Sequence, residues 1–192
     1  MFGRRRIQER RLRRAWRRNL GRPGAQEAMA RLQQAHQAMA KGDFPQAAGL
    51  FEGLATQGET FGIRSTPALL IQAGRARLMA GDVTQATAHF ERGLMLMAEV
   101  GRVLRLPIVA GSILAEMRAR GLTAEADALE IKVRRALGVQ ALAPQPAASG
   151  PRPQLPPKCP QCGGTVHPQE VEWIDSGSAV CDYCGSVLEG EA

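Results

Sequence analysis

Hydrophobic residues recur with a helical period along most of the chain between residues 25 and 138. They form runs separated by short breaks, and each of three glycines closes one run and precedes another. A pattern of this kind predicts consecutive amphipathic helices joined by tight turns. The first helices of three pairs are expected at 28–40, 69–80 and 108–119, and the second helices at 46–55, 84–97 and 124–137.

The breaks within the pairs carry residues suited to a helix end followed by a helix start. The glycines are Gly42, Gly81 and Gly121, spaced 39 and 40 residues apart. Glycine adopts the left-handed conformation that ends many helices, and a short polar side chain after it can cap the next one. The expected caps are Asp43, Asp82 and Thr123. Longer loops between pairs are expected at 57–64 and 99–106, before Pro67 and Pro107.

The glycine spacing belongs to an internal repeat. The repeated segments are Lys41-Gly-Asp-Phe-Pro-Gln-Ala47, Ala80-Gly-Asp-Val-Thr-Gln-Ala86 and, more loosely, Arg120-Gly-Leu-Thr-Ala-Glu-Ala126. Their last alanines would let paired helices approach closely, and Phe51 and Phe90 follow the first two at four residues. Residues 25–138 therefore resemble a tetratricopeptide-repeat domain. The third repeat departs from it with Glu130 at the aromatic position, and the period exceeds the family's roughly 34 residues.

The resemblance implies a mainly α fold of antiparallel helix-turn-helix repeats with a groove that binds a protein partner. A generic antiparallel six-helix bundle is the alternative. A carboxylate clamp rich in asparagine is not supported, because the chain's single asparagine, Asn19, lies outside the repeats. Exposed groove positions are expected at Arg31, Gln34, Gln72, Arg75 and Arg77. Met95, Leu96 and Met97 are expected in the core, with an adaptable binding strip as the alternative.

The pattern changes near the C-terminus, where short strand-like segments flank a turn at Gly177. The chain's four cysteines lie here, as Cys159-Pro-Gln-Cys162 and Cys181-Asp-Tyr-Cys184, each pair followed by glycine. Two CxxC turns at this spacing can close a tetrahedral four-sulfur zinc site. Two disulfides are the alternative, but the chain shows no export signal and a reducing, cytoplasmic location is expected.

Residues 159–189 resemble a zinc ribbon. One structural Zn²⁺ is expected, bound by Cys159, Cys162, Cys181 and Cys184. Four protein thiolates leave no position for an activated water, so the site is not predicted to be catalytic. His167 is a further candidate ligand but is expected at the surface. A module this small cannot hold its fold by its own core, so metal binding should supply most of its folding free energy.

Charge divides the chain into unlike parts. The net charge of +7 comprises +9 in residues 1–22, +3 in 23–157 and −5 in 158–192. The acidic ribbon should therefore be repelled by nucleic-acid phosphate. Residues 139–158 are rich in proline and predict an extended linker that could hold the ribbon as far as about 55 Å from the helices. On this prediction, unfolding the ribbon would leave the helices nearly intact.

The basic N-terminal segment has three interpretations: a helix bound to an anionic membrane surface, a segment bound to RNA or DNA phosphate, and a solvated tail without a specific partner. Its candidate binding residues are Arg4, Arg5, Arg6, Arg10, Arg11, Arg13, Arg14, Trp16, Arg17 and Arg18.

No sequence motif for catalysis is present: the chain has neither a phosphate-binding glycine loop nor HExxH, and its three histidines are scattered. The leading hypothesis is a non-enzymatic protein–protein interaction scaffold, with no small-molecule substrate, that the tail localises to an anionic surface, in the cytoplasm or peripherally at a membrane. The alternative is a nucleic-acid-associated factor that binds through the arginine tail.

Overall fold

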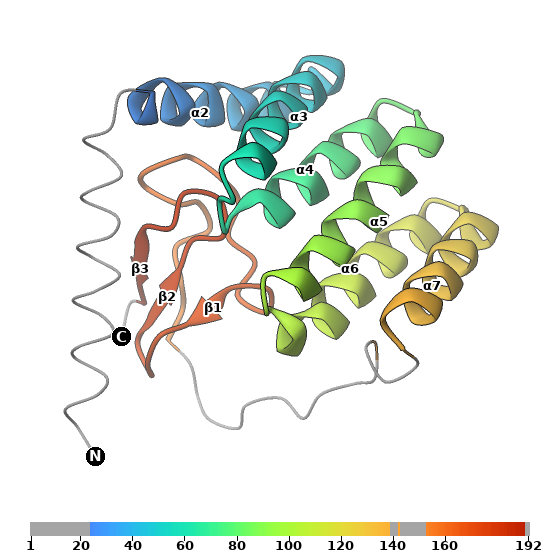
Figure 1. Ribbon diagram of the computed structural model, residues 1–192. Coiled ribbons are helices and arrows are strands. Elements are labelled where there is room, and N and C mark those ends of the chain that lie inside the picture. Colours follow the sequence, from blue (N-terminus) through green and yellow to red (C-terminus); the bar gives the residue numbers. More distant parts are fainter. Residues whose placement is uncertain (1–23, 139–141, 143–152, 191–192) are drawn as a thin grey trace.

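The computed structural model describes residues 24–138, 142 and 153–190 (Figure 1). The residues predicted to bind an anionic surface, Arg4 to Arg18, lie outside this described part of the chain. The helices in the described part are α2 (Ala25–Lys41), α3 (Phe44–Thr60), α4 (Thr66–Met79), α5 (Val83–Glu99), the 3-10 turn η1 (Val103–Arg105), α6 (Leu106–Ala119) and α7 (Thr123–Leu137). Among these residues, no helix is both long and apolar enough to span a bilayer.

Consecutive helices pack against each other in antiparallel fashion, which confirms the predicted mainly α fold class. Phe51 and Phe90 are completely buried, and the small residues Ala47 and Ala86 let the paired helices approach. Met97 is buried as predicted, whereas Met95 and Leu96 are only half-buried at the edge of the core. The predicted range 46–55 ends too early, because α3 continues to Thr60.

The turns within pairs follow the local chemistry of the sequence. Gly42, Gly81 and Gly121 all have positive φ, at 79°, 84° and 80°. The Asp43 carboxylate accepts a hydrogen bond from the Gln46 amide at 3.2 Å, and Asp82 accepts one from the Gln85 amide at 3.1 Å. The predicted cap at Thr123 is wrong. Thr123 is the first residue of α7 and the cap position falls on Leu122, whose side chain has no acceptor.

Replacing Gly81 with valine tests the turn between α4 and α5. A Cβ at Gly81 would meet no atom within 4 Å, so the cost is the left-handed backbone itself. That conformation costs about 1–2 kcal/mol for a residue with a side chain, which corresponds to a melting temperature lowered by roughly 2–8 °C. Calorimetry of Gly81→Val measures it. Gly111→Ala, in open space within α6, is the control and should not lower the melting temperature; equal values for both would exclude the strain.

The C-terminal module is a three-stranded antiparallel sheet of β1 (Glu172–Trp173), β2 (Ser178–Val180) and β3 (Val187–Glu189), in the order β1-β2-β3. In its register Trp173 pairs with Ala179, and Ala179 pairs with Leu188. The Asp175 carboxylate accepts hydrogen bonds from the Gly177 and Ser178 amides and closes the predicted turn. We call residues 153–190 the ribbon, because Leu155 is already buried with its cysteines.

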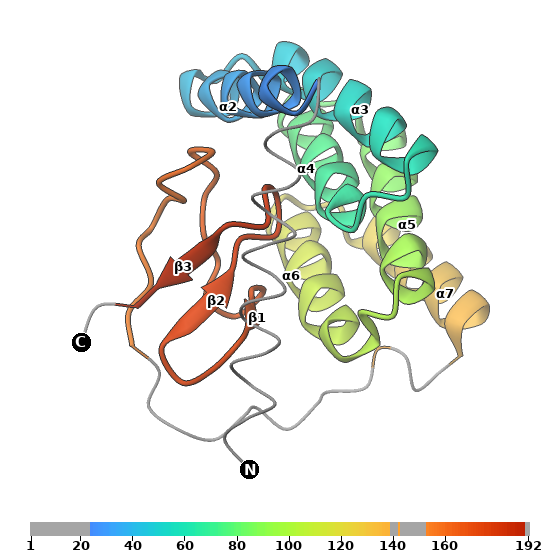
Figure 2. The same ribbon diagram turned by 60° about the vertical axis from the view of Figure 1, so that its left-hand side comes forward.

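The ribbon packs directly on the helices instead of being held away from them. In Figures 1 and 2 it lies beside α2, α4 and α6, while α3, α5 and α7 lie farther from it. Cys159, Tyr183 and Leu188 share one buried hydrophobic cluster with residues of α2, α3 and α4. The prediction that the proline-rich segment separates the two modules is therefore wrong. The proline-rich composition limits how far the ribbon can lie from the helices, but the contacts between the two surfaces determine where it lies.

Candidate metal centre

Two turns of the same construction carry the cysteines. The Gly163 amide donates to the Cys159 carbonyl at 2.9 Å, and the Cys159 amide donates to the Gly164 carbonyl at 2.8 Å. In the second turn the Gly185 amide donates to Cys181 and the Cys181 amide to Ser186, at 2.9 and 2.8 Å. Gly163 and Gly185 have φ of 76° and 74°, a conformation suited to glycine, as the sequence predicted.

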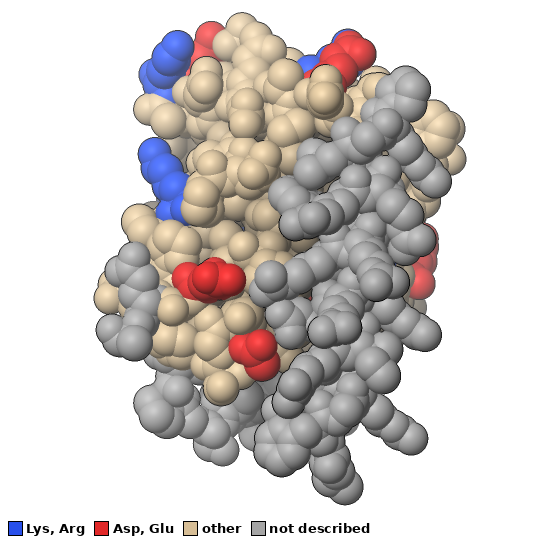
Figure 3. All heavy atoms as spheres, turned by 90° about the vertical axis from the view of Figure 1, so that its left-hand side faces the viewer, with Lys and Arg blue, Asp and Glu red and all other residues tan. Residues whose placement is uncertain are grey.

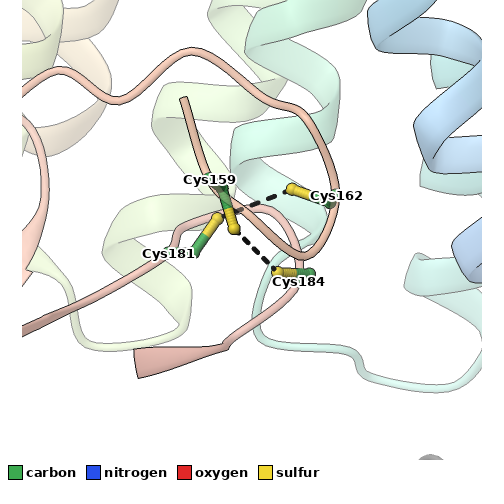
Figure 4. Close-up of side chains that lie close together, drawn as sticks. All are labelled: Cys159, Cys162, Cys181 and Cys184. Atoms are coloured by element: carbon green, nitrogen blue, oxygen red, sulfur yellow. Dashed lines mark hydrogen bonds between the residues drawn. The ribbon is translucent and has the colours of Figure 1, made fainter. Parts of the chain in front are cut away.

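The four sulfurs converge on one point between the turns (Figure 4). All four lie within 4.8 Å of one another, and no disulfide joins them. The Sγ atoms of Cys159 and Cys184 are 3.7 Å apart, and those of Cys162 and Cys181 are 3.8 Å apart. A tetrahedron with Zn–S bonds of about 2.3 Å has edges of about 3.8 Å. The donor set therefore fits a metal ion such as zinc, and the four sulfurs would complete a tetrahedral shell around it.

Ser186 adds a polar contact that the sequence analysis did not identify. Its Oγ lies 3.2 Å from the Cys159 Sγ and 3.1 Å from the Cys184 Sγ. A hydroxyl donor beside thiolates offsets part of their negative charge and orients them. The local signal was its place directly after the second turn's glycine, where the first turn has Gly164. His167 is half-buried and is not a member of the four-sulfur cluster.

The metal content can be measured directly. We expect one zinc per chain by elemental analysis of protein purified under reducing conditions without chelator, because four thiolates complete one tetrahedral site. A value of two, or of zero, would contradict the four-sulfur site.

The first cysteine turn lies against an aromatic cluster on α2 and α3. The His36 ring is 5.2 Å from the Phe51 ring and 4.9 Å from the Tyr183 ring, centroid to centroid. A Cβ on Gly164 would lie within 2.6–2.7 Å of Tyr183 and His36, so only glycine fits this contact. The Gln33 side chain also donates to the Gln161 carbonyl at 2.8 Å. Helix α2 therefore holds the first turn by shape and by one polar contact.

The second cysteine turn carries Asp182 and Tyr183 into a basic site on the helices. Arg105 donates two hydrogen bonds to the Asp182 carboxylate, at 2.7 and 2.6 Å. Arg102 adds a third at 3.3 Å, and Gln72 donates to the Tyr183 hydroxyl at 2.5 Å. Burial raises the pKa of Asp182 and lowers that of Arg102, and the pairing of the two opposes both shifts. The charges are thus desolvated and depend on each other.

A second buried ion pair lies beside the first. Arg75 of α4 bonds to Glu170 of the ribbon at 3.1 Å and to Glu116 of α6 at 3.3 Å. The Arg75 and Glu170 side chains are only 10% and 11% exposed. Attraction to Glu170 and Glu116 raises the pKa of Arg75 against the opposing effect of burial. This guanidinium therefore joins two repeats and the ribbon.

Of the five groove residues predicted to be exposed, two are exposed, two are buried and one is half-buried. Arg31 and Gln34 are exposed on α2. Gln72 and Arg75 lie under the ribbon, at 6% and 8% exposure, so for them the prediction is wrong. Arg77 is directed away to Glu52, with which it forms two hydrogen bonds at 2.7 and 2.8 Å. On α4 the ribbon thus covers Gln72 and Arg75, and Arg77 pairs with Glu52 of α3.

Figure 3 views the molecule from the side of the ribbon: the coloured side chains in the lower half of the view are red, and both red and blue ones lie above them. This agrees with the net charge of −5 in residues 158–192.

Comparisons with protein-family models, curated proteins and solved structures found no match to this chain.

The buried His36 predicts a pH dependence of stability. Burial lowers its pKa to about 4, although the nearby Cys159 thiolate acts in the opposite direction. In the unfolded chain this imidazole titrates near its usual pKa of about 6.5, so between pH 6.5 and 4 the unfolded state binds more protons. Stability should fall with pH in that window, by about 2 kcal/mol at pH 5.

Urea denaturation of the zinc-loaded protein at pH 7 and pH 5 measures this loss. His36→Phe keeps a ring at the position and removes the titration, so its stability should fall by less. Any effect of acid on the metal site is common to both proteins. Equal losses in the two would exclude His36 as the origin.

Proposed function

We propose that this protein is a non-enzymatic adaptor in which a tetratricopeptide-like helical domain and a zinc ribbon act as one protein-binding unit. The observation that carries the proposal is that α2, α4 and the segment before α6 already bind a folded protein surface, that of the ribbon. They do so with side-chain donors directed at carboxylates and at a phenol. Directional contacts of this kind are typical of protein recognition.

The chemistry of the metal site supports a structural role. Four protein thiolates complete a tetrahedral shell, so Zn²⁺ would supply folding free energy to the ribbon and present the second turn to the helices. The proposal assigns no catalytic residue and no small-molecule substrate.

Exposed apolar side chains support a protein contact beyond the ribbon. Phe61 and Leu104 are 75% and 72% exposed, in the loops between successive helix pairs. Ile63 and Val103 beside them are 45% and 49% exposed. The loops after α3 and α5 lie at the same end of the helical array in Figures 1 and 2. Several large apolar side chains gathered at a surface are typical of an interaction site.

In this proposal the arginine-rich residues 1–22 bring the adaptor to an anionic surface in the cytoplasm. The second candidate is a nucleic-acid-associated factor that binds through the same segment, which has a charge of +9 and whose basic residues are all arginine. The planar guanidinium binds phosphate with two parallel hydrogen bonds, whether the phosphate belongs to lipid or to nucleic acid.

Fractionation of native lysate separates the two candidates. Intact protein and protein lacking residues 1–22 are compared with and without nuclease, and the released material is sized by gel filtration. The adaptor predicts a nuclease-resistant complex of defined mass with a second protein, which survives deletion of the tail and is weakened by Phe61→Ser with Leu104→Ser. Nuclease-sensitive, tail-dependent sedimentation would favour the nucleic-acid factor, and elution as the chain alone would contradict the adaptor.

A further inference from the structure

The basic site that holds the second cysteine turn contacts two consecutive ribbon residues, one acidic and one aromatic. We call it the arginine groove and define it by Gln72, Arg75, Arg102 and Arg105. It receives Asp182 and Tyr183 in succession, the carboxylate on two guanidinium groups and the phenol on an amide. Both ribbon side chains are deeply buried, Asp182 at 13% and Tyr183 at 8% exposure. The groove therefore recognises an acidic residue followed by an aromatic one.

The groove has more donors than the ribbon uses. The Nε atoms of Arg102 and Arg105 are buried and have no hydrogen-bond partner among the described protein atoms. A small cavity, lined by Arg75, Arg102, Arg105, Glu170, Asp182 and Tyr183, lies at the same place. The groove thus offers donors that a ligand with additional acceptor oxygens can satisfy.

The contact is of an exchangeable kind. Ion pairs hold Asp182 and Glu170 in place, and the attraction within a buried ion pair is largely offset by the cost of desolvating both charges. A ligand that supplies the same charges would therefore replace Asp182 and Glu170 with little net electrostatic loss. The contact also has an apolar part, because Tyr183 is buried in the hydrophobic cluster that the ribbon shares with the helices, so a competing ligand needs an aromatic side chain to cover the surface that Tyr183 leaves.

We propose that the arginine groove is a binding site for an acidic–aromatic segment of a partner protein, and that the ribbon occupies it as an internal competitor. This inference rests on the proposed adaptor function and names the partner chemistry at its helical face. Zinc keeps the ribbon folded, so the ribbon occupies the groove while the metal is bound. Covalent attachment gives the ribbon an effective concentration of about 1 mM, so at equal intrinsic affinity it outcompetes about 1 µM of free segment roughly a thousandfold.

The test uses the full zinc-loaded chain and a fluorescein-labelled peptide of residues 178–187 with Cys181→Ser and Cys184→Ser, which cannot bind zinc. Asp182→Asn in the chain weakens the hold of its own ribbon, and fluorescence anisotropy should then show peptide binding at least tenfold tighter than to the wild type. Tyr183→Phe, which removes only the bond to Gln72, should give a smaller gain and serves if Asp182→Asn folds poorly by circular dichroism. Asp127→Asn, in an exposed ion pair with Arg118, is the matched control and should bind as the wild type does.

Two further arms identify the groove and its ligand. We call the Asp182→Asn chain the released chain. Adding Arg105→Gln to it should abolish peptide binding, and a peptide that carries Asp182→Asn and Tyr183→Ala should not bind to it. Equal binding to wild-type and released chains, or none to either, would overturn the inference. Dimerisation of the released chain without peptide binding would also overturn it, because the groove would then take the ribbon of a second copy. A chain that ignores the peptide yet retains its protein complex in lysate would leave the adaptor function standing.

Discussion

Replacing Cys162 with serine is expected to lower the thermal stability of the helices together with that of the ribbon. Cys162 is completely buried in the hydrophobic cluster that also contains Leu32, Phe51 and Leu69 of the helices. A serine ligand weakens zinc binding, and structural zinc supplies about 10–16 kcal/mol of apparent binding free energy in small zinc modules. Loss of the ordered ribbon removes its contacts with α2 and α4. The helices should therefore respond to a change made outside them.

The size of the effect follows from what the ribbon covers. Loss of the ribbon disrupts the buried pairs Arg75–Glu170 and Arg105–Asp182, and disrupting one such pair costs about 3–5 kcal/mol. A loss of about 4 kcal/mol lowers the melting temperature by roughly 8–16 °C for a chain of this length. Circular dichroism at 222 nm reports on the helices. Zinc content and the fluorescence of Trp173, measured in a Trp16→Phe background because the chain has two tryptophans, report on the ribbon. In the wild type the two optical signals should change in one transition.

Ser176→Ala is the matched control for this experiment. Ser176 is exposed in the same module, so its replacement should keep both the zinc and the melting temperature. An unchanged helical transition in zinc-free Cys162→Ser protein would show two uncoupled modules and would contradict the docked arrangement.

Replacing Asp182 with alanine is expected to destabilise the protein by about 3–5 kcal/mol, the usual cost of removing one partner from a buried ion pair. Arg102 and Arg105 would remain with side chains only 9% and 14% exposed and with no carboxylate between them. The cost arises chiefly from desolvated positive charge. Urea denaturation at pH 7, with zinc present, measures it.

A double-mutant cycle separates this cost from simple loss of packing. Arg105→Met in the Asp182→Ala background removes one unpaired charge and should recover part of the stability. The exposed pair Arg118–Asp127 provides the comparison, since Asp127→Ala should cost less than about 1 kcal/mol at the surface. Similar costs for Asp182→Ala and Asp127→Ala would show that the pair at the ribbon is solvated and not buried.

Both predictions concern the same property, the coupling of the ribbon to the helices. Arg75 contacts Glu116 in the third helix pair and Glu170 in the ribbon, so one side chain belongs to both modules. Disturbance on either side should therefore be felt on the other. The proposed exchange at the arginine groove requires this coupling to be weak enough for a ligand of matching charge to compete with the ribbon.

The features predicted correctly from the sequence are those fixed by neighbours in the chain. Gly81 and Asp82 determine a helix end and a helix start within a few residues, so their pattern alone locates the turn between α4 and α5. The two CxxC turns likewise place their sulfurs by local backbone geometry, and the spacing sufficed to predict the four-sulfur cluster. The predicted cap at Thr123 was wrong because the third turn follows the same geometry as the first two, with the cap directly after the glycine, and there Leu122 replaces the aspartate.

The position of the ribbon was decided by the tertiary structure alone. Asp182 and Arg105 are 77 residues apart, and Gln72 and Tyr183 are 111 apart, so no local pattern marks either pair. A proline-rich linker limits how far the ribbon can lie from the helices but does not exclude a docked position. The sequence by itself thus determined the helix pairs and the turns that bring the four cysteine sulfurs together, because short-range geometry sets both. Which face the ribbon covers, and which arginines it neutralises, depended on shape and charge complementarity between distant segments.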